Sequence, residues 1–397
     1  MMSRKEWTDT TLGAIAQPNG GLVDGPFGSN LPASLYEPRG VPVIRGSNLT
    51  LGSGRFVTDV FVYVSEATAD SLGRCLCEPG DIVFTKKGTI GQTGLVPGDG
   101  PFRRYLLSSN QMRLRVKPAV ADPLFVYYAV SSPESRAKIR RDSEATGVPK
   151  TNLTYLRSFP VGLPPLPEQR RIARILSTLD DKIELNRRMN RTLESIVRAL
   201  FPGGLQESSL GSIPKGWTVG TLGGEFRLTM GQSPPGDTYN GLGEGLPFYQ
   251  GRRDFGDRFP TRRMYCTAPT RRAEAGDTLV SVRAPVGDIN VATEPCCIGR
   301  GVAAVRHRSG ASVYTYEVMY SLRDVFADFE TAGTVFGAIG GKDFRGLSVV
   351  VPPVELISMY ESTVGSIGAL IERHYANARS LADLRDCVLP RLMFGAM

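Results

Sequence analysis

Leu163-Pro164-Pro165-Leu166 recurs 188 residues later as Val351-Pro352-Pro353-Val354. Proline is tolerated in the first turn of a helix, and it breaks a strand that precedes it. A long segment with helical rather than alternating periodicity follows each copy. The sequence therefore predicts an internal duplication, with a long helix at the end of each half.

The segment after the first Pro-Pro predicts one side of a helix pair. Its apolar residues follow gaps of four and three, the heptad spacing of a coiled-coil seam, and Asn186 and Asn190 fill the two central positions. These apolar residues are Ile172, Leu176, Leu179, Ile183, Leu193, Val197 and Leu200. Adding 188 gives the second seam, Tyr360, Val364, Ile367, Ile371, His374, Ala378, Leu381, Arg385 and Val388. Each helix should be about 50 Å long, and we expect the two to pack together as an antiparallel coiled coil.

Stop signals follow both predicted helices, and the second helix also contains two glycines. Gly203-Gly204 follows the first helix, and Pro390 is expected to end the second. Gly365 and Gly368 should weaken the second helix by about 1 kcal/mol each. An alternative stays open at this point, in which each helix only buries its apolar stripe on its own half of the chain.

The segments before each Pro-Pro also correspond. Trp7-Thr8 corresponds to Trp217-Thr218, and Gly80-Asp81-Ile82-Val83 corresponds to Gly276-Asp277-Thr278-Leu279. Short β-branched runs lie between Gly, Pro and Asp turns, which is typical of small, mostly-β domains. Helical periodicity returns late in each, at residues 123–141 and 313–331. The predicted fold class is α+β, with a pseudo-twofold internal repeat.

This organisation divides the chain into five segments. A first domain is expected at residues 1–163 and a second at 214–353, with helices between and after them. The full division is 1–163, first helix 164–201, linker 202–213, 214–353, and second helix with C-terminal tail 354–397.

Composition indicates a folded protein that is attracted to polyanions. The 397 residues are 41% hydrophobic and 22% charged, with a net charge of +8. No apolar run approaches the roughly 20 residues of a membrane span, and no apolar signal core follows Met1. The sequence therefore predicts a cytoplasmic protein without a membrane partner.

Motifs for catalysis are incomplete. Ser233-Pro234-Pro235-Gly236 lacks the aromatic residue that an amino-methylating enzyme stacks on a flipped base. Gly340-Gly341-Lys342-Asp343 resembles the end of a phosphate loop, but Phe336 occupies the position of the first glycine. The six cysteines and two histidines do not have the spacing of a zinc site. We expect no metal, no directly bound cofactor and no catalysis by this chain.

Specific motifs resemble the specificity subunits of type I restriction-modification systems. The resemblance rests on Leu163-Pro164-Pro165-Leu166-Pro167-Glu168-Gln169-Arg170-Arg171-Ile172-Ala173, on Gly25-Pro26-Phe27-Gly28-Ser29, and on Gly80-Asp81-Ile82-Val83-Phe84 through Gly88-Thr89-Ile90-Gly91. The second half matches in Gly276-Asp277-Thr278-Leu279-Val280 and Val286-Gly287. The second helix departs from the pattern, because it begins Val354-Glu355-Leu356 instead of Pro-Glu-Gln.

This resemblance implies two target-recognition domains, each reading one half of a split, asymmetric site on double-stranded DNA. It implies that the two helices fix the distance between the half-sites. Its partners would be two methyltransferase subunits, which use S-adenosylmethionine, and restriction-translocase subunits, which use ATP and magnesium.

Candidate DNA-binding residues are those that carry cations or planar donors in loops. In the first domain they are Lys86, Lys87, Ser109, Asn110, Gln111, Lys150 and Asn152, with Arg45 and Asn48 as second choices. In the second domain they are Gln250, Arg252, Arg253, Arg262, Arg263, Arg283 and Lys342. A solvated surface charge remains the alternative for each one, and an RNA- or protein-binding protein of the same architecture remains the alternative for the chain.

Three apolar residues of the first helix lie outside its seam. They are Leu185, Met189 and Ile196. Two interpretations stay open for them: they dock a partner helix, or they pack on this protein's own domains.

Overall fold

A computed structural model describes residues 7–52, 54–58, 60–144, 150–202, 213–331 and 337–394. The chain forms two compact units, the first made of Met1–Arg187 with Asn377–Met397 and the second of Arg188–Ala376. Both divisions fall inside a long helix, so each unit contains part of both helices. Residues 203–212 of the expected linker, with Gly203-Gly204, lie outside the described residues, as does Phe336.

The described residues of the first unit form three sheets. Strands β1 (Thr8–Thr11) and β10 (Pro160–Leu163) form an antiparallel pair. One four-stranded sheet has the order β2 (Leu22–Asp24), β9 (Gln111–Leu114), β6 (Ile82–Thr85), β7 (Thr93–Leu95). The other has the order β4 (Val62–Val64), β3 (Val41–Ile44), β8 (Tyr105–Leu107), β5 (Leu76–Cys77).

The second unit repeats this plan. Strands β11 (Thr218–Thr221) and β21 (Ser348–Val351) form the antiparallel pair. A four-stranded sheet has the order β12 (Phe226–Met230), β20 (Val302–His307), β17 (Thr278–Ser281), β18 (Ile289–Val291). A five-stranded sheet has the order β13 (Tyr239–Asn240), β15 (Tyr265–Cys266), β14 (Leu246–Tyr249), β19 (Cys296–Ile298), β16 (Arg272–Ala273). Among the described residues, one strand pair in each unit is parallel, β3 with β8 and β14 with β19.

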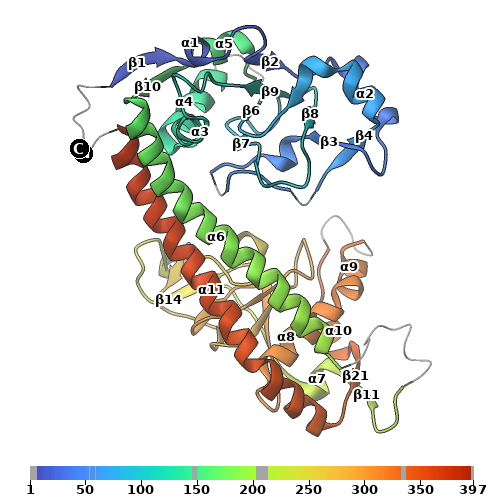
Figure 1. The fold of residues 1–397 in the computed structure, drawn as a ribbon. Helices are drawn as coiled ribbons and strands as arrows, with labels where there is room; N and C mark the ends of the chain where they lie inside the picture. Colours follow the sequence, from blue (N-terminus) through green and yellow to red (C-terminus); the bar gives the residue numbers. More distant parts are fainter. Residues whose placement is uncertain are drawn as a thin grey trace. The chain divides into compact units, whose positions relative to one another are not determined.

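The helices follow the same repeat (Figure 1). Those of the first half are α1 (Leu12–Ile15), α2 (Glu66–Ser71), α3 (Pro123–Ser131), α4 (Pro133–Glu144), α5 (Leu153–Ser158) and α6 (Leu166–Leu200). Those of the second half are α7 (Leu222–Glu225), α8 (Ser312–Ser321), α9 (Arg323–Thr331), α10 (Gly341–Gly346) and α11 (Val354–Phe394). Each late helical stretch is thus two short helices, because Ser132 and Leu322 interrupt it.

The repeat extends to single turns. Gly80 and Gly276 both have a positive φ, and the next residue, Asp81 or Asp277, accepts a backbone N–H from three residues earlier. An arginine pairs with each carboxylate, Arg115 with Asp81 and Arg306 with Asp277. The predicted correspondence of these two stretches is therefore confirmed at the level of side-chain contacts.

The two long helices contact each other inside each unit. In the first unit, Ile172 near the start of α6 shares a hydrophobic core with Leu389 near the end of α11. In the second unit, the Tyr360 hydroxyl donates to the carbonyl oxygen of Val197 at 3.0 Å. These contacts run antiparallel, and Figure 1 shows α6 (green) and α11 (red) side by side. The seam residues Val197 and Tyr360 therefore join the two helices and also belong to the hydrophobic core of their own unit.

The centre of the seam is polar, as the sequence predicts. Asn186 donates to the side-chain oxygen of Asn377 at 2.8 Å. Asn190 donates to the carbonyl oxygen of Ile371 at 3.2 Å, and its own oxygen lies 3.0 Å from Nδ1 of His374. Both Asn186 and Asn190 are buried, so a shift to another register would take these amides away from their hydrogen-bond partners.

Two predictions near the helix ends are wrong: that Leu200 belongs to the seam, and that Pro390 ends the second helix. Leu200 is half exposed, and the neighbouring Phe201 packs against Tyr360 instead, because a step of four from Val197 continues the stripe. Pro390 does not end α11, which runs on to Phe394. Three buried residues around it (Leu389, Leu392 and Met393) hold the last turn in the core and offset the hydrogen bond that proline removes.

Gly368 has a packing role. A Cβ at this position would lie 2.8 Å from Cγ2 of Val313 in α8, so the glycine lets α11 approach α8 closely. The expected loss of helix propensity at Gly368 is thus offset by a close helix contact.

Candidate nucleic-acid interface

Three loops of the first unit meet at the ends of β6 and β9. The Lys86 N–H donates to the carbonyl oxygen of Asn110 at 2.7 Å, and the Thr151 N–H donates to that of Lys86 at 3.1 Å. Lys87 and Lys150 form an isolated β-bridge. We call residues 85–87, 108–111 and 150–152 the first loop cluster. It brings together Lys86, Lys87, Ser109, Asn110, Gln111, Lys150 and Asn152, which the sequence nominated from separate segments.

Neighbouring backbone contacts bring two more segments to this cluster. The Ser108 N–H donates to the carbonyl oxygen of Ile44 at 3.0 Å, which places Arg45 next to the 108–111 turn. The Gly25 N–H donates to the carbonyl oxygen of Gln111 at 2.9 Å, which fixes the start of the 25–30 loop against the same turn.

The second unit builds the same assembly from equivalent bonds. The Val282 N–H donates to the carbonyl oxygen of Gly301 at 2.9 Å, and the Ile339 N–H donates to that of Val282 at 3.0 Å. Arg283 and Ala338 form the isolated bridge that corresponds to Lys87 and Lys150. We call residues 282–284, 299–302 and 338–342 the second loop cluster. Arg283 is therefore the counterpart of Lys87.

Arg300 belongs to this cluster and was missed in the sequence. It occupies the place of Ser109, it is exposed, and its Nε donates to the Ser233 hydroxyl at 3.2 Å. Gln250 is next to it, because its Cα lies 3.3 Å from the Cβ that Gly299 would carry. The signal for Arg300 was available: Gly299-Arg300-Gly301 precedes β20 as Ser108-Ser109-Asn110 precedes β9.

Two nominated side chains have structural roles instead. Asn48 is completely buried, donates to the carbonyl oxygens of Val57 (3.1 Å) and Val60 (2.8 Å), and accepts the Arg45 N–H. Gln111 is buried, and its amide oxygen accepts a hydrogen bond from the Ser108 hydroxyl. We therefore correct both assignments, because buried amides that hold a turn are not available to a base edge.

Several other candidates already have an intramolecular partner. Lys86 pairs with Asp24 at 2.9 Å and Arg262 pairs with Glu294 at 2.5 Å. The Arg263 guanidinium donates to the carbonyl oxygen of Arg253 at 3.3 Å. Asn152 caps α5 by accepting the Tyr155 N–H at 2.8 Å. The other nominated cations are exposed, and of these Arg252 forms an ion pair with Asp288. They are Arg45, Lys87, Lys150, Arg252, Arg253, Arg283 and Lys342.

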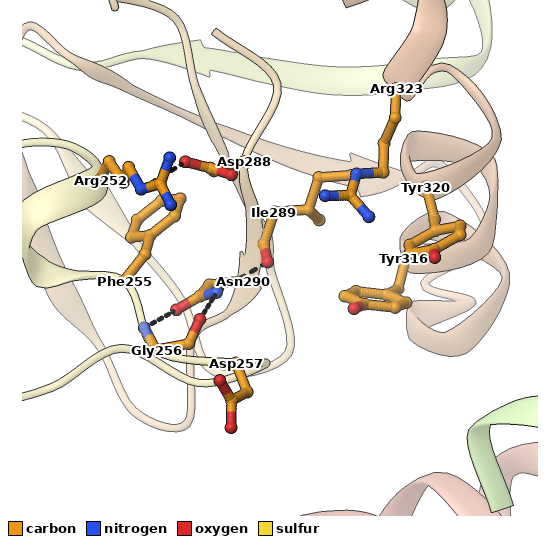
Figure 2. A pocket seen from close by; sticks show the side chains of 10 residues that line it. All are labelled: Arg252, Phe255, Gly256, Asp257, Asp288, Ile289, Asn290, Tyr316, Tyr320 and Arg323. Atoms are coloured by element: carbon orange, nitrogen blue, oxygen red, sulfur yellow. Dashed lines mark hydrogen bonds and ion pairs between the residues drawn. The ribbon is translucent and has the colours of Figure 1, made fainter. Parts of the chain in front are cut away.

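Arg252 lines a cavity of about 260 Å³ in the second unit (Figure 2). Its Nε lies 3.3 Å from Oδ2 of Asp288, so part of its charge is neutralised there. Figure 2 shows this ion pair on one side of the cavity and Tyr316, Tyr320 and Arg323 on the other.

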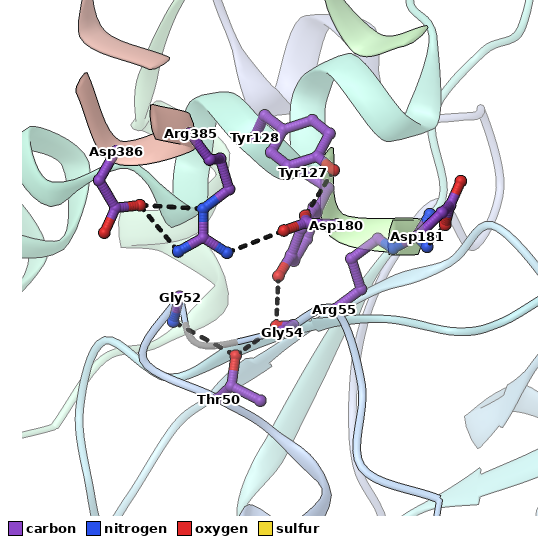
Figure 3. A network of polar contacts seen from close by, with 10 residues as sticks. All are labelled: Thr50, Gly52, Gly54, Arg55, Tyr127, Tyr128, Asp180, Asp181, Arg385 and Asp386. Carbon is purple, nitrogen blue, oxygen red and sulfur yellow. Dashed lines mark hydrogen bonds and ion pairs between the residues drawn. The ribbon is translucent and has the colours of Figure 1, made fainter. Parts of the chain in front are cut away.

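A buried polar network attaches the first unit's body to the helix pair (Figure 3). Asp180 of α6 accepts from Arg385 of α11 at 2.8 Å and from the Tyr128 hydroxyl of α3 at 2.6 Å. Arg55 pairs with the neighbouring Asp181. Burial raises the pKa of the Tyr128 phenol above its usual value, so this hydroxyl stays protonated and donates.

The adjacent thiols of Cys296 and Cys297 are buried and unsuited to nucleophilic chemistry. Burial raises the pKa of Cys296 and of Cys297 to about 12, so both are neutral thiols at pH 7. Among the described residues, no three His, Cys, Asp or Glu side chains gather where they could hold a metal ion. Over the same residues, no helix is long and apolar enough to cross a membrane.

The two units thus contain equivalent loop clusters, held by corresponding backbone hydrogen bonds. A family model for the "Type I restriction modification DNA specificity domain" matches residues 5–195. The putative MjaX type I restriction enzyme specificity subunit of Methanocaldococcus jannaschii is 31% identical over 351 residues, covering 84% of this chain and 82% of that protein. This chain belongs to the family of type I restriction enzyme specificity subunits.

More distant relatives agree. The HindI type I restriction enzyme specificity subunit of Haemophilus influenzae is 20% identical, over 78% of this chain and 86% of its own length. The crystal structure of a type I restriction-modification S subunit from M. genitalium superimposes with a TM-score of 0.61 at 18% identity, covering 98% of this chain and 97% of that one. That likeness supports the mixed helix-and-strand fold.

Proposed function

We propose that this specificity subunit reads a bipartite, asymmetric site on double-stranded DNA. Each unit contacts one half-site through its loop cluster, with Lys87 and Lys150 in the first and Arg283 and Arg300 in the second. The observation that carries the proposal is the duplicated assembly of cation-bearing loops, held by equivalent backbone hydrogen bonds in both units. Exposed cations on fixed loops suit phosphates and base edges.

The two helices form the spacer of this arrangement. We retain the expected target-recognition domains at residues 1–163 and 214–353, with an antiparallel coiled coil of 164–201 and 354–397 as the element between the half-sites. The buried Asn186 and Asn190 support this role, because they specify a single register for the pair.

The subunit contributes recognition, and its partners contribute catalysis. Two methyltransferase subunits hold S-adenosylmethionine, and restriction-translocase subunits hold ATP and magnesium. Met189 and Ile196 support a docking role for α6, because they are 38% and 42% exposed and lie two turns apart on one face of the helix. Leu185 is 47% exposed as well, so none of the three is buried against this chain's own domains.

Mapping methylated adenines in a host that expresses this chain with its methyltransferase partners tests the proposal. We expect one split motif, two unlike half-sites with a constant gap, and two methyltransferase subunits purified with one copy of this chain. An uninterrupted motif, or a motif that is unchanged when the chain is deleted, would contradict it.

A further inference from the structure

Phe27 is a large apolar side chain left in solvent. It is 81% exposed, whereas Pro26 before it is buried. A single exposed apolar residue requires no explanation by itself. Three further observations bear on whether Phe27 has a binding role: its backbone, its neighbours and its counterpart in the second unit.

The backbone that carries Phe27 is fixed. A Cβ at Gly25 would lie 1.9 Å from the carbonyl oxygen of Ser108, so the 25–30 loop lies directly against the 108–111 turn. The Phe27 carbonyl oxygen accepts the Asn30 N–H at 2.8 Å, which closes a tight turn after the ring. The ring is therefore presented on a preorganised loop, which lowers the entropy lost on binding.

The surroundings of this loop suit a polyanion. Asp24, directly before the loop, pairs with Lys86 at 2.9 Å, and Lys86 belongs to the first loop cluster. Lys87 and Lys150 of that cluster are exposed. An apolar ring beside exposed cations is the combination that contacts bases while cations contact phosphates.

The second unit has a polar counterpart. Its Gly231 N–H donates to the carbonyl oxygen of Val302 at 2.9 Å, as Gly25 does to Gln111. Two residues later, where the first unit has Phe27, Ser233 accepts a hydrogen bond from Arg300. The two units therefore present different chemistry at equivalent places, an apolar ring in one and a hydroxyl-guanidinium pair in the other.

We propose that Phe27 makes an apolar contact with the bases of the half-site that the first unit reads, and so helps to determine that half of the specificity. The inference rests on the proposed function. An aromatic side chain can meet a thymine methyl group in the major groove or insert between base steps in the minor groove. The Ser233–Arg300 pair would read the other half-site by hydrogen bonding.

Three duplexes test this contact: one with the mapped motif and two with one half-site scrambled. The full chain with its methyltransferase partners is compared with its Phe27→Ala and Phe27→Leu variants. Val120→Ala is the matched control, because Val120 is also an exposed apolar residue, at 46%. Its carbonyl oxygen accepts a hydrogen bond from Gln169 at the start of α6, outside the first loop cluster. The dissociation constant is measured over a series of salt concentrations.

We expect Phe27→Ala to weaken binding of the intact motif by about tenfold. The slope of affinity against salt should stay unchanged, because no charge is lost. The loss should disappear when the first unit's half-site is scrambled and persist when the other one is. Phe27→Leu should retain part of the affinity, and Val120→Ala all of it.

Equal losses on all three duplexes, or no loss on the intact motif, would overturn the inference and leave the proposed function standing. Weaker methyltransferase co-purification with unchanged DNA binding would assign Phe27 to a protein interface and also overturn it. If the unaltered chain does not distinguish the mapped motif from scrambled DNA, the proposed function fails first.

Discussion

Lys87 and Arg283 occupy equivalent positions in the two loop clusters, and both are exposed. If they contact phosphates of the two half-sites, Lys87→Ala and Arg283→Ala should each weaken binding and reduce the salt slope by about 1. Fluorescence anisotropy with the mapped duplex at several salt concentrations measures both quantities. The double variant should lose about two units of slope, because the sites are independent.

Arg104→Ala is the matched control for this pair. Arg104 is a surface cation of the first unit that already pairs with Glu66 and Asp70. Its removal should leave the slope unchanged. A slope that falls equally in the control and in the two cluster variants would show a general effect of net charge and contradict the assignment.

Gly25 and Gly28 give a test of the loop itself. Alanine at Gly25 would place its Cβ 1.9 Å from the Ser108 carbonyl oxygen, whereas alanine at Gly28 meets nothing within 4 Å. Gly25→Ala should lower the free energy of unfolding by about 1–3 kcal/mol and weaken DNA binding, while Gly28→Ala should leave the free energy of unfolding unchanged. Chemical denaturation and binding to the mapped duplex check the two effects, and an equal loss of stability in both variants would refute the packing assignment.

At the residue scale, the sequence predicted residue types better than their exposure. Lys87, Lys150 and Arg283 are exposed as expected, but Asn48 and Gln111 are buried and hold turns. Amides and hydroxyls serve turns and base edges equally well, and only the folded chain shows which groups are already hydrogen-bonded.

At the level of elements, the Asp180–Arg385 pair joins α6 to α11 inside the first unit. The side chains are 7% and 9% exposed, so removing one partner leaves an uncompensated charge. Arg385→Met should reduce the free energy of unfolding by about 3–5 kcal/mol, and adding Asp180→Leu should recover part of that loss. Thermal and chemical unfolding provide the measurement. A double variant as unstable as Arg385→Met would show that the stabilisation comes from Arg385 packing rather than from its charge.

Glu317 of α8 introduces a pH dependence into the second unit. Burial raises its pKa above 4.5 although Arg198 lies 3.5 Å away, so the folded state holds this proton more tightly than the unfolded state does. Stability should therefore fall as pH rises from 4.5 through the raised value. Glu317→Gln should flatten this part of the curve of melting temperature against pH. Parallel curves for the variant and the unaltered chain would argue against a raised pKa.

The two long helices, which repeat along the chain, were predictable from the sequence, and the short strands were less so. The 188-residue offset located both long helices within a few residues, because a heptad sustained over several turns has few alternatives. The strands are two to six residues long, too short for a reliable period, so only mostly-β halves could be expected. The end of α11 was missed because burial of Leu392 and Met393 outweighs Pro390.

At the scale of the whole molecule, α6 and α11 each pass from one unit into the other. The division falls between Arg187 and Arg188 in α6, and between Ala376 and Asn377 in α11. The contacts on either side of it are Asn186 with Asn377 and Asn190 with Ile371. A change in length at this level would therefore leave the loop clusters and the contacts inside each unit intact.

This geometry predicts the effect of lengthening the spacer. The change inserts seven residues after Arg187 and seven after Ala376, with apolar residues at the seam positions. Each insertion adds one heptad, so the seam is preserved and becomes about 10 Å longer. If the helix pair sets the gap between half-sites, the methylated motif should keep both half-sites and gain up to about 3 base pairs of unread gap at roughly 3.4 Å each. Adenine-methylation mapping reads the new gap directly. The same insertion in α6 alone shifts the seam of one helix against the other and should abolish the motif, whereas an unchanged gap in the double insertion would show that the helices do not measure the distance.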